Sequence, residues 1–218
     1  MDLYPLYLTV KVSFTATIFT AAIGLGLALV LAKKDFRGKN VLDVLIMQPL
    51  VIPPTVLGYY LLTVFGHSSF IGRFFEDYLG IEVVFTWKGA VVAAFVSSLP
   101  LFVKPARAAI EEVSGELEDA ARLLGRTELD ILRTVTLPLA WRGMAAGAVM
   151  AFARATGEFG ATLMVAGNIP GSTRTLPIAI YDAVQMGDDF TANMLVIIVT
   201  VFSFLVLYGV GIFTRGKF

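Results

Sequence analysis

Long apolar runs without a charged side chain dominate the hydropathy pattern of this chain. Three of them are Val12–Ala32, Val44–Phe65 and Phe190–Thr214. Crossing the hydrocarbon core of a bilayer takes about 20 helical residues, and each run is long enough. Gly89–Val103 is shorter, and Gly143–Gly167 contains Arg154 and Glu158, so these two runs are weaker candidates. The pattern predicts a single all-α membrane domain, residues 1–218, with about five transmembrane helices.

Prolines interrupt the second run. Pro49, Pro53 and Pro54 fall within Val44–Phe65, and a proline inside a helix removes a backbone donor and clashes with the preceding turn. In lipid, the freed carbonyl groups need partners in neighbouring helices or in a water-lined cavity. Two interpretations stay open: a kink that serves packing, or a helix broken at Pro53 and Pro54 that lines a translocation path.

A charge-dense segment lies between the third and fourth runs. Within it, four apolar residues are spaced i, i+3, i+4 and i+7, as on one face of a helix. They are Leu117, Ala120, Ala121 and Leu124. Gly125 follows directly and suits a left-handed cap. Thr127 and Asp130 have the spacing of a capping box, so a second short helix begins there, and Pro138 is expected to end it.

The first of these short helices has a face suited to a protein partner. Its small residues permit close approach to a partner's groove. The remaining surface is polar and mainly acidic, with Glu116, Glu118, Asp119 and Arg122. Helices that lie in the lipid interface instead carry Lys and Arg on the polar face, and an anionic leaflet would repel an acidic one. The residues favour protein docking over lipid contact.

Composition agrees with a membrane protein. Hydrophobic residues make up 57% and charged residues 16% of the chain, against about 45–50% and about 25% in soluble domains. The formal net charge is zero, which gives no reason to expect a nucleic-acid partner. With no cysteine and one histidine, His67, no disulfide, metal site or cofactor is expected. No G-x-x-x-x-G-K-[ST] motif occurs, so ATP hydrolysis is not expected from this chain.

The Lys and Arg distribution predicts an orientation. Basic residues concentrate in residues 33–41, in 104–142 and in the tail with Arg215 and Lys217. The connections 66–88 and 168–189 hold few. Because short loops rich in Lys and Arg stay in the cytoplasm, the charge-dense segment and the C-terminus are expected there and the N-terminus outside. No basic stretch precedes the first apolar run, which is therefore expected to be a retained helix and not a signal peptide.

Arg154 and Glu158 form a candidate charged pair inside the fourth run. They are four residues apart, hence on one helical face, where opposite charges can neutralise each other. An ionisable residue within a membrane segment is a functional-site hypothesis by default. Two roles stay open: a structural ion pair that ties helices or two copies of the chain together, or a gate or guide for an anion.

The charge-dense segment resembles the EAA loop of ABC-importer permeases. The shared positions are Asp119, Ala120, Ala121, Gly125, Val135, Leu137 and Pro138. Asp119 and Val135 stand where the family pattern has Glu and Ile. The resemblance implies the type-1 permease fold, with a cytoplasmic coupling loop at about residues 114–138 that docks on a separate ATPase subunit. The residues to which it gives a coupling role are Leu117, Asp119, Ala120, Ala121, Leu124, Gly125 and Pro138.

A second stretch is similar to the permeases of bacterial molybdate importers. Its matching positions are Gly157–Thr162, Asn168–Gly171, Thr173, Thr175–Pro177 and Tyr181, and Pro49 and Val51–Val56 match as well. The resemblance implies an ATP-driven oxyanion importer, with molybdate as the first choice and tungstate, sulfate or thiosulfate as alternatives. An intramembrane enzyme that uses Arg154, Glu158 and His67 is a further alternative, although no nucleophile, base and acid are spaced together.

The resemblance also implies partners. Two copies of this chain would line one pathway in the bacterial cell membrane, in contact with lipid. Two cytoplasmic ATP-binding subunits would dock on the coupling loops, and an extracytoplasmic binding protein would deliver the oxyanion to loops 66–88 and 168–189. The candidates for the pathway or its gate are Arg154, Glu158, Pro53 and Pro54.

Overall fold

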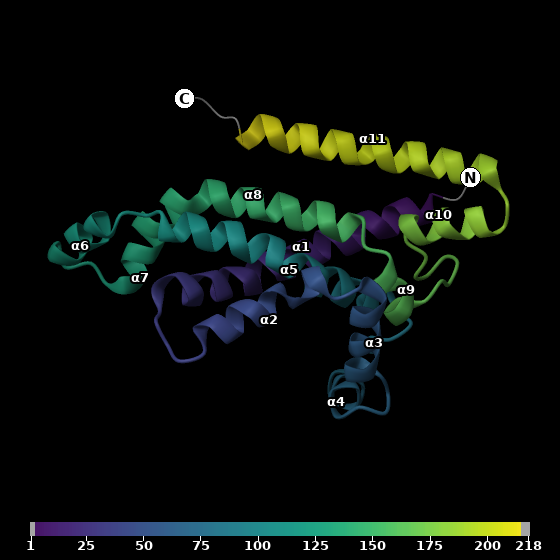
Figure 1. Cartoon of the computed structure of the whole chain (residues 1–218), viewed down its shortest axis with the longest axis horizontal. Helices are drawn as coiled ribbons and strands as arrows, with labels where there is room; N and C mark the ends of the chain where they lie inside the picture. Colours follow the sequence, from purple (N-terminus) through teal and green to yellow (C-terminus); the bar gives the residue numbers. More distant parts are fainter. Residues whose placement is uncertain (1–2, 215–218) are drawn as a thin grey trace.

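The computed structural model describes residues 3–214, and every regular element in that range is a helix (Figure 1). The helices are α1 (Tyr4–Lys33), α2 (Lys39–Val51), α3 (Pro54–Phe65), α4 (Phe70–Leu79), α5 (Trp87–Glu111), α6 (Gly115–Leu123), α7 (Glu128–Ile131), the π-helical turn η1 (Leu132–Thr136), α8 (Leu137–Thr156), α9 (Gly160–Ala166), α10 (Leu176–Gln185) and α11 (Asp189–Thr214). Within that range, four stretches are long and apolar enough to cross a membrane, and α2 with α3 makes a fifth if that bent pair is one span. The predicted all-α fold is confirmed. Arg215 and Lys217, used to predict the orientation, lie outside the described residues.

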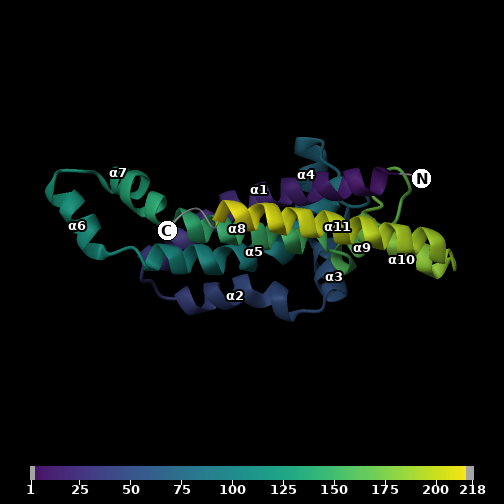
Figure 2. The same ribbon diagram turned by 90° about the horizontal axis from the view of Figure 1, so that it is seen from above.

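Helices α1, α5 and α8 form the core of the bundle (Figures 1 and 2). Their buried apolar side chains include Leu31, Phe102, Val103, Ile110 and Ala151. A Cβ at Gly24 of α1 would lie 2.6 Å from Cδ1 of Phe102, and one at Gly147 of α8 would lie 3.0 Å from the backbone oxygen of Phe102. Small residues at such contacts are typical of membrane helices, which associate by close packing because lipid is as apolar as they are.

The second predicted span is a broken helix. The chain bends by 116° between α2 and α3. Pro53 and Pro54 lack the N–H groups that would continue α2, and the amide of Ile52 is the last to bond back, to the oxygen of Gln48 at 3.0 Å. Pro49 lies inside α2 without ending it. A bend of this size changes the direction of the chain, so the geometry is that of a broken helix and not of a kink.

The fourth predicted span ends earlier than the sequence indicates. α8 stops at Thr156, and α9 is a separate short helix, so the prediction of one helix over Gly143–Gly167 is wrong. Gly157 at the break is a weak helix former. The amide of Ala161 in α9 donates to the side chain of Glu158 at 3.0 Å, which supplies the new helix with a partner for one of its free amides.

α7 runs into α8 without a stop, so the prediction that Pro138 ends the second short helix is wrong. In the π-helical turn between them, the amide of Leu137 bonds to the oxygen of Leu132. Pro138 then falls in the first turn of α8, where a missing N–H is tolerated. Glu128–Thr156 is therefore one continuous helical stretch.

Candidate coupling loop and membrane pathway

The candidate coupling loop, residues 114–138 (hereafter the coupling loop), turns at Gly125, as the sequence predicts. Gly125 has a φ of 74°, its amide donates to the oxygen of Arg122 at 2.9 Å, and the amide of Arg126 donates to the oxygen of Ala121 at 3.2 Å. These two bonds close the end of α6 and need a left-handed residue between them, a conformation that glycine adopts without steric cost. In Figures 1 and 2, α6 and α7 protrude together from one end of the bundle.

Thr127 caps α7, which confirms the predicted capping box. Its Oγ1 accepts a hydrogen bond from the amide of Asp130 at 3.2 Å, and Oδ2 of Asp130 accepts one from the amide of Thr127 at 3.3 Å. The hydroxyl of Thr127, and then its amide, donate to the carboxylate of Asp130 and hold the pKa of that group below its usual value. The start of α7 is thus fixed by reciprocal bonds, with Asp in the position that Glu or Gln usually takes.

α6 presents an apolar face to its surroundings. Leu117, Leu123 and Leu124 are 51%, 89% and 83% exposed. Ala120 is exposed as well, and Ala121 is half-buried. Contiguous exposed apolar side chains indicate an interaction surface. The part of the chain that the structure describes does not cover this face.

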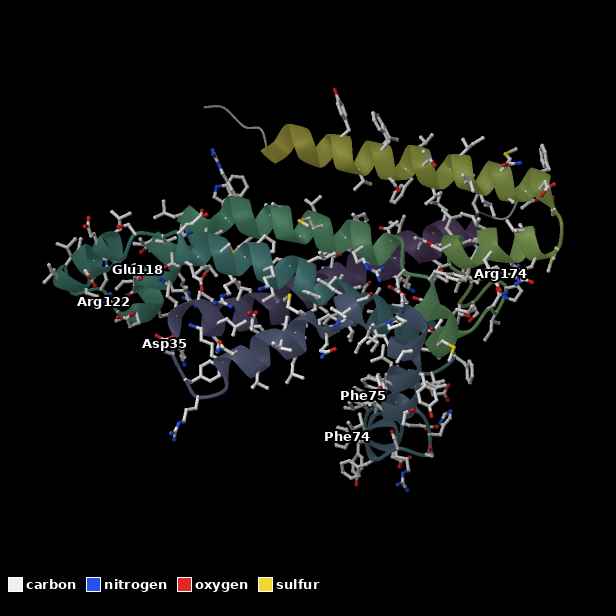
Figure 3. The ribbon with its side chains drawn as sticks, viewed as in Figure 1. Asp35, Phe74, Phe75, Glu118, Arg122 and Arg174 are labelled. Carbon is white, nitrogen blue, oxygen red and sulfur yellow. The ribbon has the colours of Figure 1, made fainter. Side chains whose placement is uncertain are left out.

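Arg122 joins α6 to α7 (Figure 3). Its guanidinium lies 2.6 Å from Asp119 and 2.6 Å from Glu128. Hydrogen bonds to Glu128, and then to Asp119, raise the pKa of Arg122, and the bond from Arg122 lowers the pKa of Glu128. All three side chains are more than one-third exposed, so solvent and salt screen the network. No local pattern in the sequence selects Glu128, because its partner Arg122 lies on the other side of the corner.

Glu118 points inward, which corrects the prediction that it lies on the open polar surface of α6. Its Oε1 accepts hydrogen bonds from Nζ of Lys33 and Oγ1 of Thr136, both at 2.6 Å. The residue is 6% exposed. Burial by itself would raise the pKa of Glu118, but the hydrogen bonds from Lys33 and Thr136 outweigh it and lower the pKa. No local pattern reveals the contact, because Lys33 lies 85 residues earlier in the chain.

Arg154 and Glu158 form an ion pair with 2.7 Å between Nη2 and Oε2. The prediction that they share one helical face is wrong, because Glu158 lies in the turn after α8. The side chain of Glu158 is 1% exposed and that of Arg154 27%. The other carboxylate oxygen of Glu158 accepts the amide of Ala161. One carboxylate therefore joins the end of α8 to the start of α9.

The break between α8 and α9 packs against the proline break between α2 and α3. A Cβ at Gly160 would lie 2.9 Å from Cβ of Pro54, and a Cβ at Gly58 of α3 would lie 2.9 Å from Cα of Ala161. Such distances require glycine at both positions. Figure 1 shows α3 and α9 side by side, at the end of the bundle away from α6. The structure thus places the proline break next to the turn that contains Glu158, and both of them far from the coupling loop.

A polar network orders the loop between α9 and α10. Arg174 (Figure 3) lies 3.0 Å from Asp182 and donates to Oδ1 of Asn168 at 2.7 Å. Asn168 in turn donates to Asp182 at 3.0 Å. The charge of Arg174 is therefore matched within the chain, and the loop that the sequence assigned to the outer side has a fixed shape.

Comparisons with known proteins agree with this arrangement. The family described as "binding-protein-dependent transport system inner membrane component" matches residues 22–217. The molybdenum transport system permease protein ModB of Escherichia coli strain K12 is 45% identical over 192 residues, which cover 87% of this chain and 84% of that protein. The sulfate transport system permease protein CysT of Salmonella typhimurium strain LT2 is 34% identical over 203 residues, which cover 93% of this chain and 73% of that protein.

A solved structure shares the fold. A chain of the inward-facing MetNI methionine ABC transporter superposes with a TM-score of 0.74, at 19% identity, over 97% of this chain and 93% of that one. At this identity the likeness concerns the fold alone. The family match and the relatives, however, each extend over most of the chain. The chain belongs to the family of binding-protein-dependent transport system inner membrane components, the permease subunits of ABC transporters.

Proposed function

We propose that this chain is the membrane subunit of an ATP-driven molybdate importer. The observation that carries the proposal is the apolar face of α6, held out from the bundle by the corner at Gly125. A permease that takes its energy from a separate ATPase needs a surface for that partner, and a short helix with small residues fits a groove. The ATP-binding subunit would hold α6 by Leu117, Leu124 and the alanines between them.

The orientation and the second copy belong to the same proposal. Lys and Arg concentrate near α6, so we place that end in the cytoplasm and the N-terminus outside. Ile197 and Phe204 of α11 are 62% and 66% exposed, and Tyr59 and Tyr60 of α3 are 57% and 54% exposed. These apolar faces are suited to lipid along α11 and to a second copy of the chain at α3. The α3 face lies beside the paired helix breaks, which are the break between α2 and α3 and the break between α8 and α9.

The choice of molybdate rests on similarity and on the charge of the pathway candidates. ModB is 45% identical to this chain and CysT 34%, so sulfate is the second candidate. Arg154 is largely neutralised by Glu158 at 2.7 Å. Because Glu158 already neutralises the charge of Arg154, an oxyanion that passes the pair would bind Arg154 weakly. Weak binding favours release of the anion over its retention. Recognition of the anion would then be the task of the extracytoplasmic binding protein.

Transport by the complete complex tests this function. The permease, its ATP-binding subunits and the binding protein are reconstituted in proteoliposomes, and the uptake of labelled molybdate is followed with and without ATP. We expect ATP-dependent uptake that excess tungstate inhibits more than excess sulfate. Preferential uptake of sulfate would move the chain to the second candidate, and no ATP-dependent uptake of either anion would overturn the proposal.

A pull-down tests the docking face separately. Leu124→Asp places a carboxylate in the proposed apolar contact, where desolvation disfavours it. The ATP-binding subunit should therefore be lost from the purified complex. Val184→Asp on α10 is the matched control, since Val184 is 60% exposed but lies at the other end of the molecule. Equal recovery of the ATP-binding subunit with both variants would contradict docking on α6.

A further inference from the structure

Helix α6 is attached to the bundle in an unusual way. Across Gly115–Leu123, all of which the structure describes, Glu118 is the one buried residue. A surface helix of a globular protein normally buries an apolar stripe against the core. The leucines of α6 are exposed instead, Leu117 to 51% and Leu123 to 89%. The side chain that faces inward is a carboxylate.

The partners of Glu118 belong to two different membrane helices. Lys33 is the last residue of α1, and Thr136 is the last residue of the π-helical turn that opens α8. Both donate to the same oxygen, Oε1, at 2.6 Å. Thr136 is 1% exposed, so its hydroxyl has little access to water as an alternative partner. Hydrogen bonds in which one group is charged are shorter and roughly twice as strong as neutral ones.

The other polar link of α6 is exposed and leads to α7. Arg122 connects α6 to Asp119 in the same helix and to Glu128 in α7. The side chains of Asp119 and Glu128 are 71% and 74% exposed, against 8% for Glu118. Exposed ion pairs hold their partners weakly. Of these side-chain links, the one through Glu118 is therefore the buried link of α6 to α1 and to the start of α8.

We propose that Glu118 is the positioning residue that transmits movement of α6 to α1 and α8, through Lys33 and Thr136. This inference rests on the proposed function, because it assumes that an ATP-binding subunit moves α6. The inference assigns different roles to two neighbouring acids. Asp119 stays exposed beside the docking face, and Glu118 transmits the movement to the membrane helices. α8 is one continuous helix from Thr136 to the turn that contains Glu158, so a displacement at its start moves the paired helix breaks at its end.

The attachment is tested without any transport. Since the chain has no cysteine, Leu123→Cys on α6 gives a single site for a spin label in the full-length permease in lipid nanodiscs. We expect the label to move faster when Glu118→Gln or Lys33→Met is added. Asp35→Asn is the matched control, because Asp35 pairs with Lys39 near the same end but its side chain is 98% exposed. It should leave the label unchanged.

Transmission is tested in the reconstituted complex, without the label. In Glu118→Gln and Lys33→Met, ATP hydrolysis should persist while the uptake per ATP hydrolysed falls about ten-fold, which corresponds to about 1.4 kcal/mol of coupling free energy. The exchange Lys33→Glu with Glu118→Lys should restore most of the lost uptake. If Glu118→Gln does not fold, Thr136→Val replaces it, since it removes one hydrogen bond and keeps the ion pair.

Three results would overturn the inference. They are unchanged label motion in both single variants, an uptake per ATP that stays at the wild-type value, and loss of the assembled complex that the charge exchange does not repair. The last would make Glu118 a folding element only. If the wild-type complex takes up no oxyanion, the proposed function fails, and the label measurement still decides whether Glu118 holds α6.

Discussion

The coupling loop and the paired helix breaks each depend on one buried carboxylate, but the two carboxylates act over different distances. Glu118 joins segments 85 residues apart, and within α6 it is the one buried residue. Glu158 bonds to a residue four positions before it and to one three positions after it, beside α9, whose buried residues include Ala161 and Val165. The loop is therefore ordered by a few polar bonds, and the breaks by packing with a local ion pair. We therefore expect the first region to move as a unit and a change in the second region to disturb the core.

The largest expected effect is on the coupling corner. Gly125→Val puts a β-branched side chain at a φ of 74°, where strain costs about 1–3 kcal/mol. The corner should relax, which turns α6 out of its docking geometry. We expect uptake per ATP hydrolysed to fall by up to about 100-fold, with the permease still folded. Proteoliposome uptake and ATP hydrolysis, measured together, check this.

Gly115→Ala is the control for this corner. Gly115 begins α6, a built Cβ there contacts nothing within 4 Å, and its φ lies outside the left-handed region. Transport should remain at the wild-type level. If Gly125→Val also keeps wild-type uptake and hydrolysis, the corner does not set the position of α6. The coupling loop would then not be ordered in the way that distinguishes it from the helix breaks.

The next effect is on the ion pair at the breaks. Glu158→Gln keeps an acceptor for the amide of Ala161 but removes the charge that neutralises Arg154. The unmatched guanidinium should then retain the oxyanion, so uptake falls roughly ten-fold while the substrate concentration for half-maximal uptake decreases. Arg154→Met with Glu158→Gln removes the charge of both partners and should recover part of the rate. Loss of the folded protein in detergent from Glu158→Gln alone would instead assign the pair a structural role.

Local patterns along the chain were sufficient for the corner of the coupling loop. Gly125 after an apolar helical face, and Thr127 three residues before Asp130, predict the left-handed cap and the capping box that the structure contains. Both features depend on residues within one or two turns of each other. The apolar runs likewise predicted the all-α fold, since a bilayer imposes a length that can be counted in the sequence.

The failed predictions involve contacts that a local pattern does not contain. Pro138 would end an isolated helix, but a π-helical turn places it where its missing N–H is harmless. Gly143–Gly167 is apolar enough for one span, yet Gly160, just after the turn, packs closely against Pro54 of α3, from a distant part of the chain. Glu118 has the spacing of a surface residue on α6, and its burial depends on Lys33. The sequence therefore predicts elements better than the contacts that join them.

A smaller effect tests the packing of the two breaks. Gly58→Ala adds a Cβ that would lie 2.6 Å from Cβ of Met164 and 2.9 Å from Cα of Ala161. Overpacking of this kind costs typically about 1–3 kcal/mol, so the thermal unfolding temperature in detergent should fall. Gly26→Ala is the matched control in α1, since its Cβ meets nothing within 4 Å and alanine is the better helix former. Equal unfolding temperatures for both variants would show that the breaks are not tightly packed.

The smallest effect is the response of the coupling loop to pH. The pKa values of Asp130 and Glu128 are lowered, by bonds from Thr127 and Arg122 respectively. Their stabilisation of the α6–α7 corner is complete above their usual pKa values, near pH 4, and is lost as the pH falls further toward the lowered values. A spin label at Arg126→Cys should therefore move faster as the pH is lowered below about 4. A label at Val184→Cys on α10 should change less over the same range. If both labels respond together, the coupling loop is not a separately ordered unit, and its order comes from the bundle and not from these polar bonds.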